Sequence, residues 1–133
     1  MPYIEVTTFA LPREAKRELA RRITEAFAMQ GVPADWVKVV FHRLEPEDYV
    51  QGGIFPYEGR EVGKEVFGPG IADITVGPLE EAEKRRIAEG VSAALTGVGI
   101  EEERVQIRFR HVSGRDIAEG GGVFPFRPPG STW

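Results

Sequence analysis

The sequence has no cysteine and only two histidines among its 133 residues. The lack of thiols excludes disulfide scaffolds, zinc sites built on thiolates and cysteine nucleophiles. No segment approaches the roughly 20 consecutive apolar residues of a membrane span, and the first residues lack the basic and apolar regions of a signal peptide. We therefore expect a cytoplasmic protein with no membrane partner.

The sequence also has no large excess of acidic or of basic residues. Against 21 Asp and Glu stand 17 Lys and Arg, which gives a formal net charge of −4 at pH 7. Nucleic-acid affinity comes largely from basic side chains that neutralise phosphates, so the acidic balance argues against such a partner. With 41% apolar and 29% charged residues, the chain has the composition of a globular domain with a hydrophobic core.

The chain contains two copies of one unit. The matching segments are 21–25 with 85–89, 37–43 with 105–111, and 52–57 with 121–126. Three matches in the same order favour a duplication over chance similarity, and a repeat must be recognised before the fold is assigned.

Each copy has the same order of elements. Residues 3–8 and 72–76 alternate apolar and polar side chains, which is typical of half-buried strands. Apolar side chains at helical spacing follow in each copy. We expect Pro12 and Pro78 to lie in the first turn of these helices. Segments 37–43 and 105–111 then resume the strand pattern. A strand, helix, strand unit of this length normally makes its two strands parallel.

These elements predict an α+β fold, with two tandem β-α-β units that form a four-stranded sheet with two helices on one face. We expect one domain, divided into repeat one (about 2–57), a connector (about 58–70), repeat two (about 71–126) and an irregular tail (127–133). A short strand is possible near 50–55. A ferredoxin-like binding module has the same order of elements, and its repeats would pair into one antiparallel sheet.

Pro2 carries the sharpest chemical signal. A small residue after the initiator permits removal of Met1, which would leave Pro2 with a free secondary amine at the start of the first strand. An α-amino group titrates near ~7.7 to 8.0, and burial or nearby cations favour its neutral form. Pro2 is therefore a candidate general base at physiological pH.

Residues 1–6 (MPYIEV), the two β-α-β copies and the glycines at 52–53 and 120–122 together resemble the tautomerase superfamily. The tandem copy is similar to its fused members, such as the cis-3-chloroacrylic acid dehalogenases. The resemblance implies Pro2 as the catalytic residue, no cofactor, and a homotrimer with a barrel-like assembly. Only the first copy could present an amine, because the second begins inside the chain.

The resemblance also implies that cationic side chains bind a small carboxylate or keto acid. Arg13 lies near the family's helix-start position, and Lys38 falls at the position of a strand arginine. Arg108 and Arg110 share one face of their strand, and this face is either solvated or part of a site between subunits. Two like charges on one face need an anion or water.

Tyr49 and His42 are weaker candidates for the substrate pocket. Tyr49 falls where single-unit family members place an apolar aromatic, and His42 lies near a strand end. His42 and His111 lack a third ligand at a characteristic spacing, so we expect no metal site. The chain lacks the helix histidine and paired arginines of the dehalogenase-like members, which argues against dehalogenation.

We therefore predict a tautomerase or isomerase in which Pro2 moves a proton during keto-enol or double-bond isomerisation. The alternatives are a hydratase, dehalogenase or decarboxylase of a short unsaturated or semialdehyde acid, with Pro2 as the acid, or a noncatalytic trimeric relative.

Overall fold

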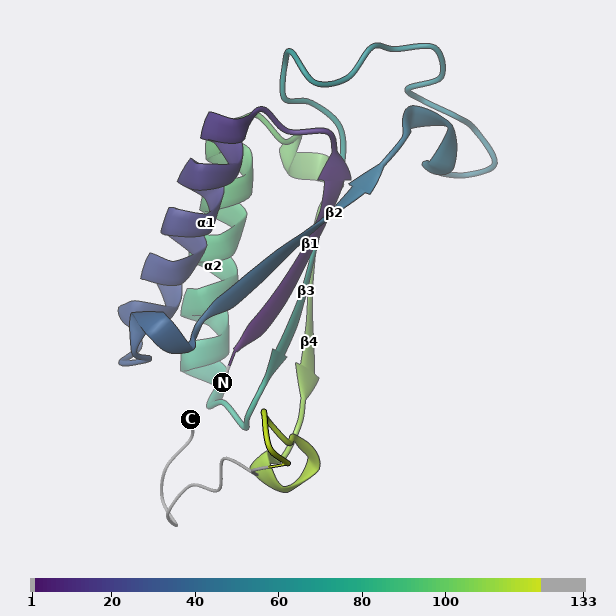
Figure 1. Ribbon diagram of the computed structural model, residues 1–133. Helices are drawn as coiled ribbons and strands as arrows, with labels where there is room; N and C mark the ends of the chain where they lie inside the picture. Colours follow the sequence, from purple (N-terminus) through teal and green to yellow (C-terminus); the bar gives the residue numbers. More distant parts are fainter. Residues whose placement is uncertain (1, 123–133) are drawn as a thin grey trace.

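The computed structural model describes residues 2–122, which form two successive strand, helix, strand units (Figure 1). The first unit consists of β1 (Tyr3–Phe9), α1 (Arg13–Ala28) and β2 (Lys38–Leu44). The second consists of β3 (Gly70–Val76), α2 (Glu81–Val98) and β4 (Val105–His111). The predicted duplication and the order of elements are therefore confirmed.

The strands form one mixed sheet in the order β2-β1-β3-β4. β1 and β2 are parallel, β3 and β4 are parallel, and the two central strands β1 and β3 are antiparallel. Tyr3 lies opposite Lys38, and Ile71 lies opposite Gln106, as expected if Lys38 and Gln106 are equivalent. The parallel pairing within each unit overturns the ferredoxin-like alternative, which requires one antiparallel sheet.

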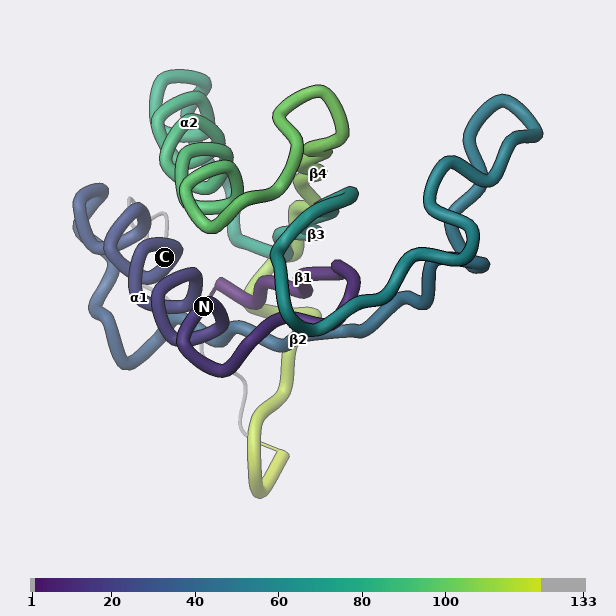
Figure 2. Tube along the Cα trace, turned by 90° about the horizontal axis from the view of Figure 1, so that it is seen from above, coloured from purple at the N-terminus to yellow at the C-terminus, as the bar shows by residue number. Residues whose placement is uncertain are grey.

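Both helices lie side by side on one face of the sheet (Figure 2). The alternation of the central strands points one apolar row at the helices, and the helices return an apolar stripe at helical spacing. The fully buried members of this core include Ile4, Val6, Leu19, Ile23, Phe27, Ala72, Ile74, Val76, Ile87, Val91 and Leu95. The opposite face of the sheet has no helix over it within residues 2–122 (Figure 2).

Contrary to our prediction, neither proline lies in the first turn of its helix. α1 begins at Arg13, and Pro12 is the residue directly before it. α2 begins at Glu81, so Pro78 also precedes its helix. The backbone N–H of Glu80 donates to the Glu83 carboxylate over 3.1 Å. A carboxylate near the first turn can accept an N–H that would otherwise be unpaired, so this helix starts without a proline.

The predicted strand near residues 50–55 is also wrong. This segment contains a single bridge between Gln51 and Ile54, which closes a tight turn. Gly52 and Gly53 both have positive φ, at 60° and 77°, and only glycine adopts this conformation readily in succession. The turn reverses the chain within four residues and leaves no length for a strand.

A cluster of aromatic rings attaches the connector to the sheet. Phe9 at the end of β1 meets Tyr57 and Phe67 edge-on, with ring centroids 5.1 and 5.5 Å apart. The Tyr57 hydroxyl donates to the Glu101 carboxylate, which also accepts the Gly68 N–H over 2.8 Å. Burial, together with this carboxylate, raises the pKa of Tyr57 well above its usual value. The cluster therefore fixes the connector at the end of the sheet opposite Pro2.

The last residues of the predicted second repeat (123–126) and the predicted tail (127–133) lie outside the described residues. Within residues 2–122, neither α1 nor α2 combines the length and apolarity that a membrane crossing requires.

We predict that Tyr57→Phe destabilises the fold by about 1–3 kcal/mol, because the half-buried Glu101 carboxylate loses its hydroxyl donor. Urea unfolding followed by circular dichroism measures the change. The matched control is Tyr49→Phe, whose hydroxyl donates to the exposed Gln51 side chain. An equal loss in both variants would contradict the role given to Glu101.

Candidate active site

Pro2 lies fully buried at the start of β1, beside a cavity of about 300 Å³. Its carbonyl oxygen accepts the backbone N–H of Lys38 over 3.0 Å, which ties the starts of β1 and β2 together. The residues that line the cavity are Pro2, Tyr3, Lys38, Thr75, Ile117, Ala118, Glu119 and Gly120. Pro2 is thus next to a space large enough for a small organic acid.

The topology explains why these residues meet. Parallel pairing places the start of β2 beside the start of β1, and antiparallel pairing places the end of β3 on the other side of β1. The chain that follows β4 then lies beyond the same end of the sheet (Figure 1). Residues 117–120 of this loop form one wall of the cavity. Three other parts of the sequence therefore converge on Pro2.

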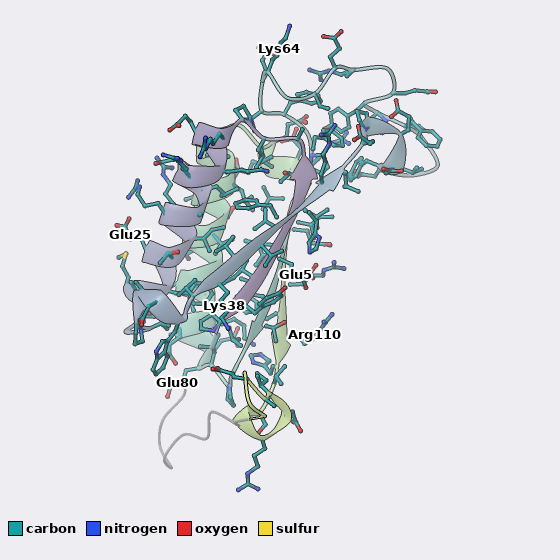
Figure 3. All side chains as sticks on the ribbon, in the orientation of Figure 1. Glu5, Glu25, Lys38, Lys64, Glu80 and Arg110 are labelled. Atoms are coloured by element: carbon teal, nitrogen blue, oxygen red, sulfur yellow. The ribbon has the colours of Figure 1, made fainter. Side chains whose placement is uncertain are left out.

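Among residues 2–122, Lys38 is the only cation that lines this cavity. Its side chain is exposed and, within the described part of the chain, has no ion-pair partner. Figure 3 shows Lys38 at the same end of the sheet as the start of β1. The structure thus brings together two of the predicted site residues, Pro2 and Lys38.

Arg110 lies on the same row of the sheet. The strand register aligns Lys38, Tyr3, Thr75 and Arg110 across the four strands. Strands are spaced about 4.8 Å apart, so the backbones of Lys38 and Arg110 are separated by about 14 Å. Arg110 lines a second cavity of about 260 Å³ that shares Thr75 with the first. Arg110 forms no ion pair within residues 2–122.

Arg108 differs from Arg110 because its charge is already paired. Its guanidinium donates to both carboxylate oxygens of Asp73 on the neighbouring strand, over 2.7 and 3.0 Å. This hydrogen bonding and the charge of Asp73 raise the pKa of Arg108 above its usual value. Of the two partners that we expected for the pair of arginines, an anion or water, Arg108 has an anion, the Asp73 carboxylate of the same chain.

His42 lies farther along the open face. Its Nε2 is 2.9 Å from the Glu5 carboxylate on β1. His42 lines a separate cavity of about 140 Å³ near the end of β1 and does not line the Pro2 cavity. Within one chain, it is thus not part of the space beside Pro2.

Arg13 and Tyr49 lie at the opposite end of the sheet from Pro2. β1 has seven residues, which corresponds to about 23 Å, and Arg13 begins the helix that follows it. Tyr49 lies in the segment between β2 and β3, where its ring is 5.9 Å from that of Tyr57. Neither side chain reaches the Pro2 cavity of its own chain.

Sequence reasoning missed Tyr3, Thr75 and Glu119. The first two occupy polar positions in alternating strands, so their place on the open face was predictable from the alternation and the pairing. Glu119 had no comparable signal, because its position depends on how the loop after β4 folds. Within residues 2–122, the Glu119 side chain has no hydrogen-bond or ion-pair partner.

The same residues contain no group of His, Asp and Glu side chains that could hold a metal ion.

Comparison with known proteins assigns the first unit. Residues 2–56 match the family model described as "Tautomerase enzyme". A comparison with curated proteins finds no significant match.

Solved structures share the fold of most of the chain. Pt0534 inactivated by 2-oxo-3-pentynoate has a TM-score of 0.72 at 21% identity, covering 92% of this chain and 95% of its own. A fused 4-OT described as a symmetric trimer has a TM-score of 0.72 at 15% identity, with coverage of 92% and 94%. A malonate semialdehyde decarboxylase inhibited by 3-bromopropiolate has a TM-score of 0.66 at 18% identity, covering 90% of each chain.

The protein therefore has the fold of proteins with two fused β-α-β units. The family match covers the unit that begins with Pro2, and the solved structures show the fold.

We predict that phosphate will shift the Arg110 guanidinium resonances more than the Arg108 Nε–H resonance in a heteronuclear NMR titration. The reason is that Asp73 already occupies the Arg108 donors. In Asp73→Asn, the Arg108 resonance should become as sensitive to phosphate as that of Arg110. Equal sensitivity of both arginines in the unchanged protein would contradict the pairing.

Proposed function

We propose that the protein is a cofactor-independent tautomerase that acts on small carboxylates through the secondary amine of Pro2, freed by removal of Met1. The observation that carries this proposal is the cavity that Pro2 shares with the unpaired Lys38. The cation can bind the carboxylate of a substrate, and the amine beside it can then remove a proton from that substrate or donate one to it.

The proposed reaction conserves all atoms of the substrate. The Pro2 amine takes the proton of an enol hydroxyl, the oxygen becomes a carbonyl, and the resulting ammonium returns a proton to the neighbouring carbon. Lys38 binds the carboxylate and stabilises the negative charge that develops between the two steps. The rigid pyrrolidine ring holds the nitrogen in place relative to β1.

The comparisons support this proposal through two kinds of relative. The family match begins at Pro2 itself. Two proteins of the same fold are described as inactivated or inhibited by small acetylenic acids, 2-oxo-3-pentynoate and 3-bromopropiolate. Reagents of this kind are therefore suitable probes for Pro2 in this chain.

We further infer a homotrimer of single-domain chains, because a fused 4-OT of the same fold is described as a trimer. β2 and β4 are both edge strands within residues 2–122, so each presents unpaired backbone groups for association. Only another copy could bring Arg13 and Tyr49 to a Pro2 cavity, because both lie at the far end of their own sheet. A trimer would thus allow these predicted residues to act on a neighbour's substrate.

A second candidate function uses Pro2 as an acid, in a hydratase, dehalogenase or decarboxylase. Glu119 favours it, because a carboxylate in the same cavity stabilises a protonated amine. The fold likeness to a malonate semialdehyde decarboxylase fits the same alternative. A noncatalytic relative would show none of these activities.

We expect the intact mass of the purified protein to equal that of the sequence without Met1. Pro2→Ala should then lower kcat/KM for keto-enol conversion of phenylpyruvate by about 100-fold or more, the usual size of a general acid-base contribution. Size-exclusion chromatography should show an unchanged assembly. Retention of Met1, or full activity in Pro2→Ala, would refute Pro2 as the base.

We expect Lys38→Gln to raise KM for the same acid about tenfold, which is the order of magnitude of one hydrogen bond to a charged group. Lys38→Arg should retain most of the binding. Lys64→Gln is the matched control, since Lys64 lies in the connector at the other end of the molecule (Figure 3). A similar effect of both glutamine variants would point to net charge and not to the cavity.

A further inference from the structure

In the described part of the chain, one cation and one carboxylate line the Pro2 cavity, and they do not pair with each other. Lys38 comes from the start of β2, and Glu119 comes from the loop after β4. Neither side chain forms an ion pair within residues 2–122. An incoming substrate therefore meets a positive charge from one element and a negative charge from another.

We propose that Glu119 makes this site selective for substrates that carry a single negative charge; the inference rests on the proposed function of the cavity. Glu119 acts here as a specificity-determining residue and takes no part in the proton transfer.

The size of the cavity supports this assignment. In about 300 Å³, a small acid whose carboxylate binds Lys38 and whose reacting carbons lie at Pro2 must place its remaining end against the other walls. Those walls include Ile117 and Ala118, which are apolar, and Glu119. An apolar or hydrogen-donating end fits this surface. A second carboxylate would lie within a few ångströms of a like charge, which is unfavourable.

The neighbouring cavity offers the competing arrangement. Arg110 lines it, and Thr75 belongs to both cavities. A longer dianion could bind Lys38 with one carboxylate and Arg110 with the other, across about three strand spacings. In that case dianions would be preferred by the unchanged protein, and Glu119 would have little influence on the choice.

The test compares kcat/KM for a monoanion, phenylpyruvate, with that for a dianion, oxaloacetate, in their keto-enol conversion. The unchanged protein should favour the monoanion. Glu119→Gln should raise the ratio of dianion to monoanion about fivefold or more, as expected for the loss of one like charge near 4 Å in a water-exposed site. Glu119→Asp, which keeps the charge, should leave the preference for the monoanion in place.

Asp116→Asn is the matched control. Asp116 lies three residues earlier in the same loop, in the short turn Gly114–Asp116, and does not line the cavity. The Asp116→Asn substitution removes the same charge from the same segment as Glu119→Gln. We expect it to change the ratio of kcat/KM for the dianion to that for the monoanion by less than twofold. An equal change of this ratio in Asp116→Asn and Glu119→Gln would overturn the inference, because the effect would then come from the overall electrostatic field of the protein. An unchanged ratio in Glu119→Gln would overturn it as well.

A second measurement does not depend on turnover. Pro2 is labelled with 3-bromopropiolate, monitored by mass spectrometry, and protected with either butyrate or succinate. In the unchanged protein, butyrate should protect Pro2 at a lower concentration than succinate does. Glu119→Gln should bring these two protective concentrations closer together. This result without any turnover would refute the proposed tautomerase but support the charge selectivity. Better protection by succinate in the unchanged protein, or failure to label Pro2, would overturn the selectivity.

Discussion

The antiparallel pairing of β1 with β3 at the centre of the sheet determines most of what surrounds Pro2. Because each central strand is also parallel to its own partner, both crossovers place their helices on the same face. The core forms between that face and the helices, and the other face keeps its polar and charged side chains. The same pairing brings the end of β3 to the start of β1, which provides Thr75 beside Pro2.

Much of this arrangement could be predicted from the sequence because it depends on local periodicity. The alternation of Ile4 and Val6 with Glu5 and Thr7 identifies a half-buried strand, and the repeated pattern identifies its copy. The right-handed crossover then makes each pair of strands parallel, which places Lys38 next to Pro2. These features needed only the spacing of residues along one unit.

Other features depend on relations between the units, and the sequence does not encode them locally. The pairing of Arg108 with Asp73 follows from the register of β3 and β4. Arg108 and Arg110 look equivalent in the sequence, but within residues 2–122 only Arg110 is left to bind an external anion. Glu119 reaches the cavity only because of how the loop after β4 turns. The error at Pro78 has a different cause, since carboxylates can replace proline at a helix start.

The register also relates Pro2 to a residue in the second unit. Pro2 directly precedes Tyr3, which pairs with Lys38 in the strand register. In the same way, Gly70 directly precedes Ile71, which pairs with Gln106. Gly70 therefore occupies the corresponding place, but its nitrogen belongs to the peptide bond with Pro69. Joining two units in one polypeptide keeps the number of strands and helices while halving the number of terminal amines. The stoichiometry of such amines in any assembly thus follows the number of polypeptides and not the number of folding units.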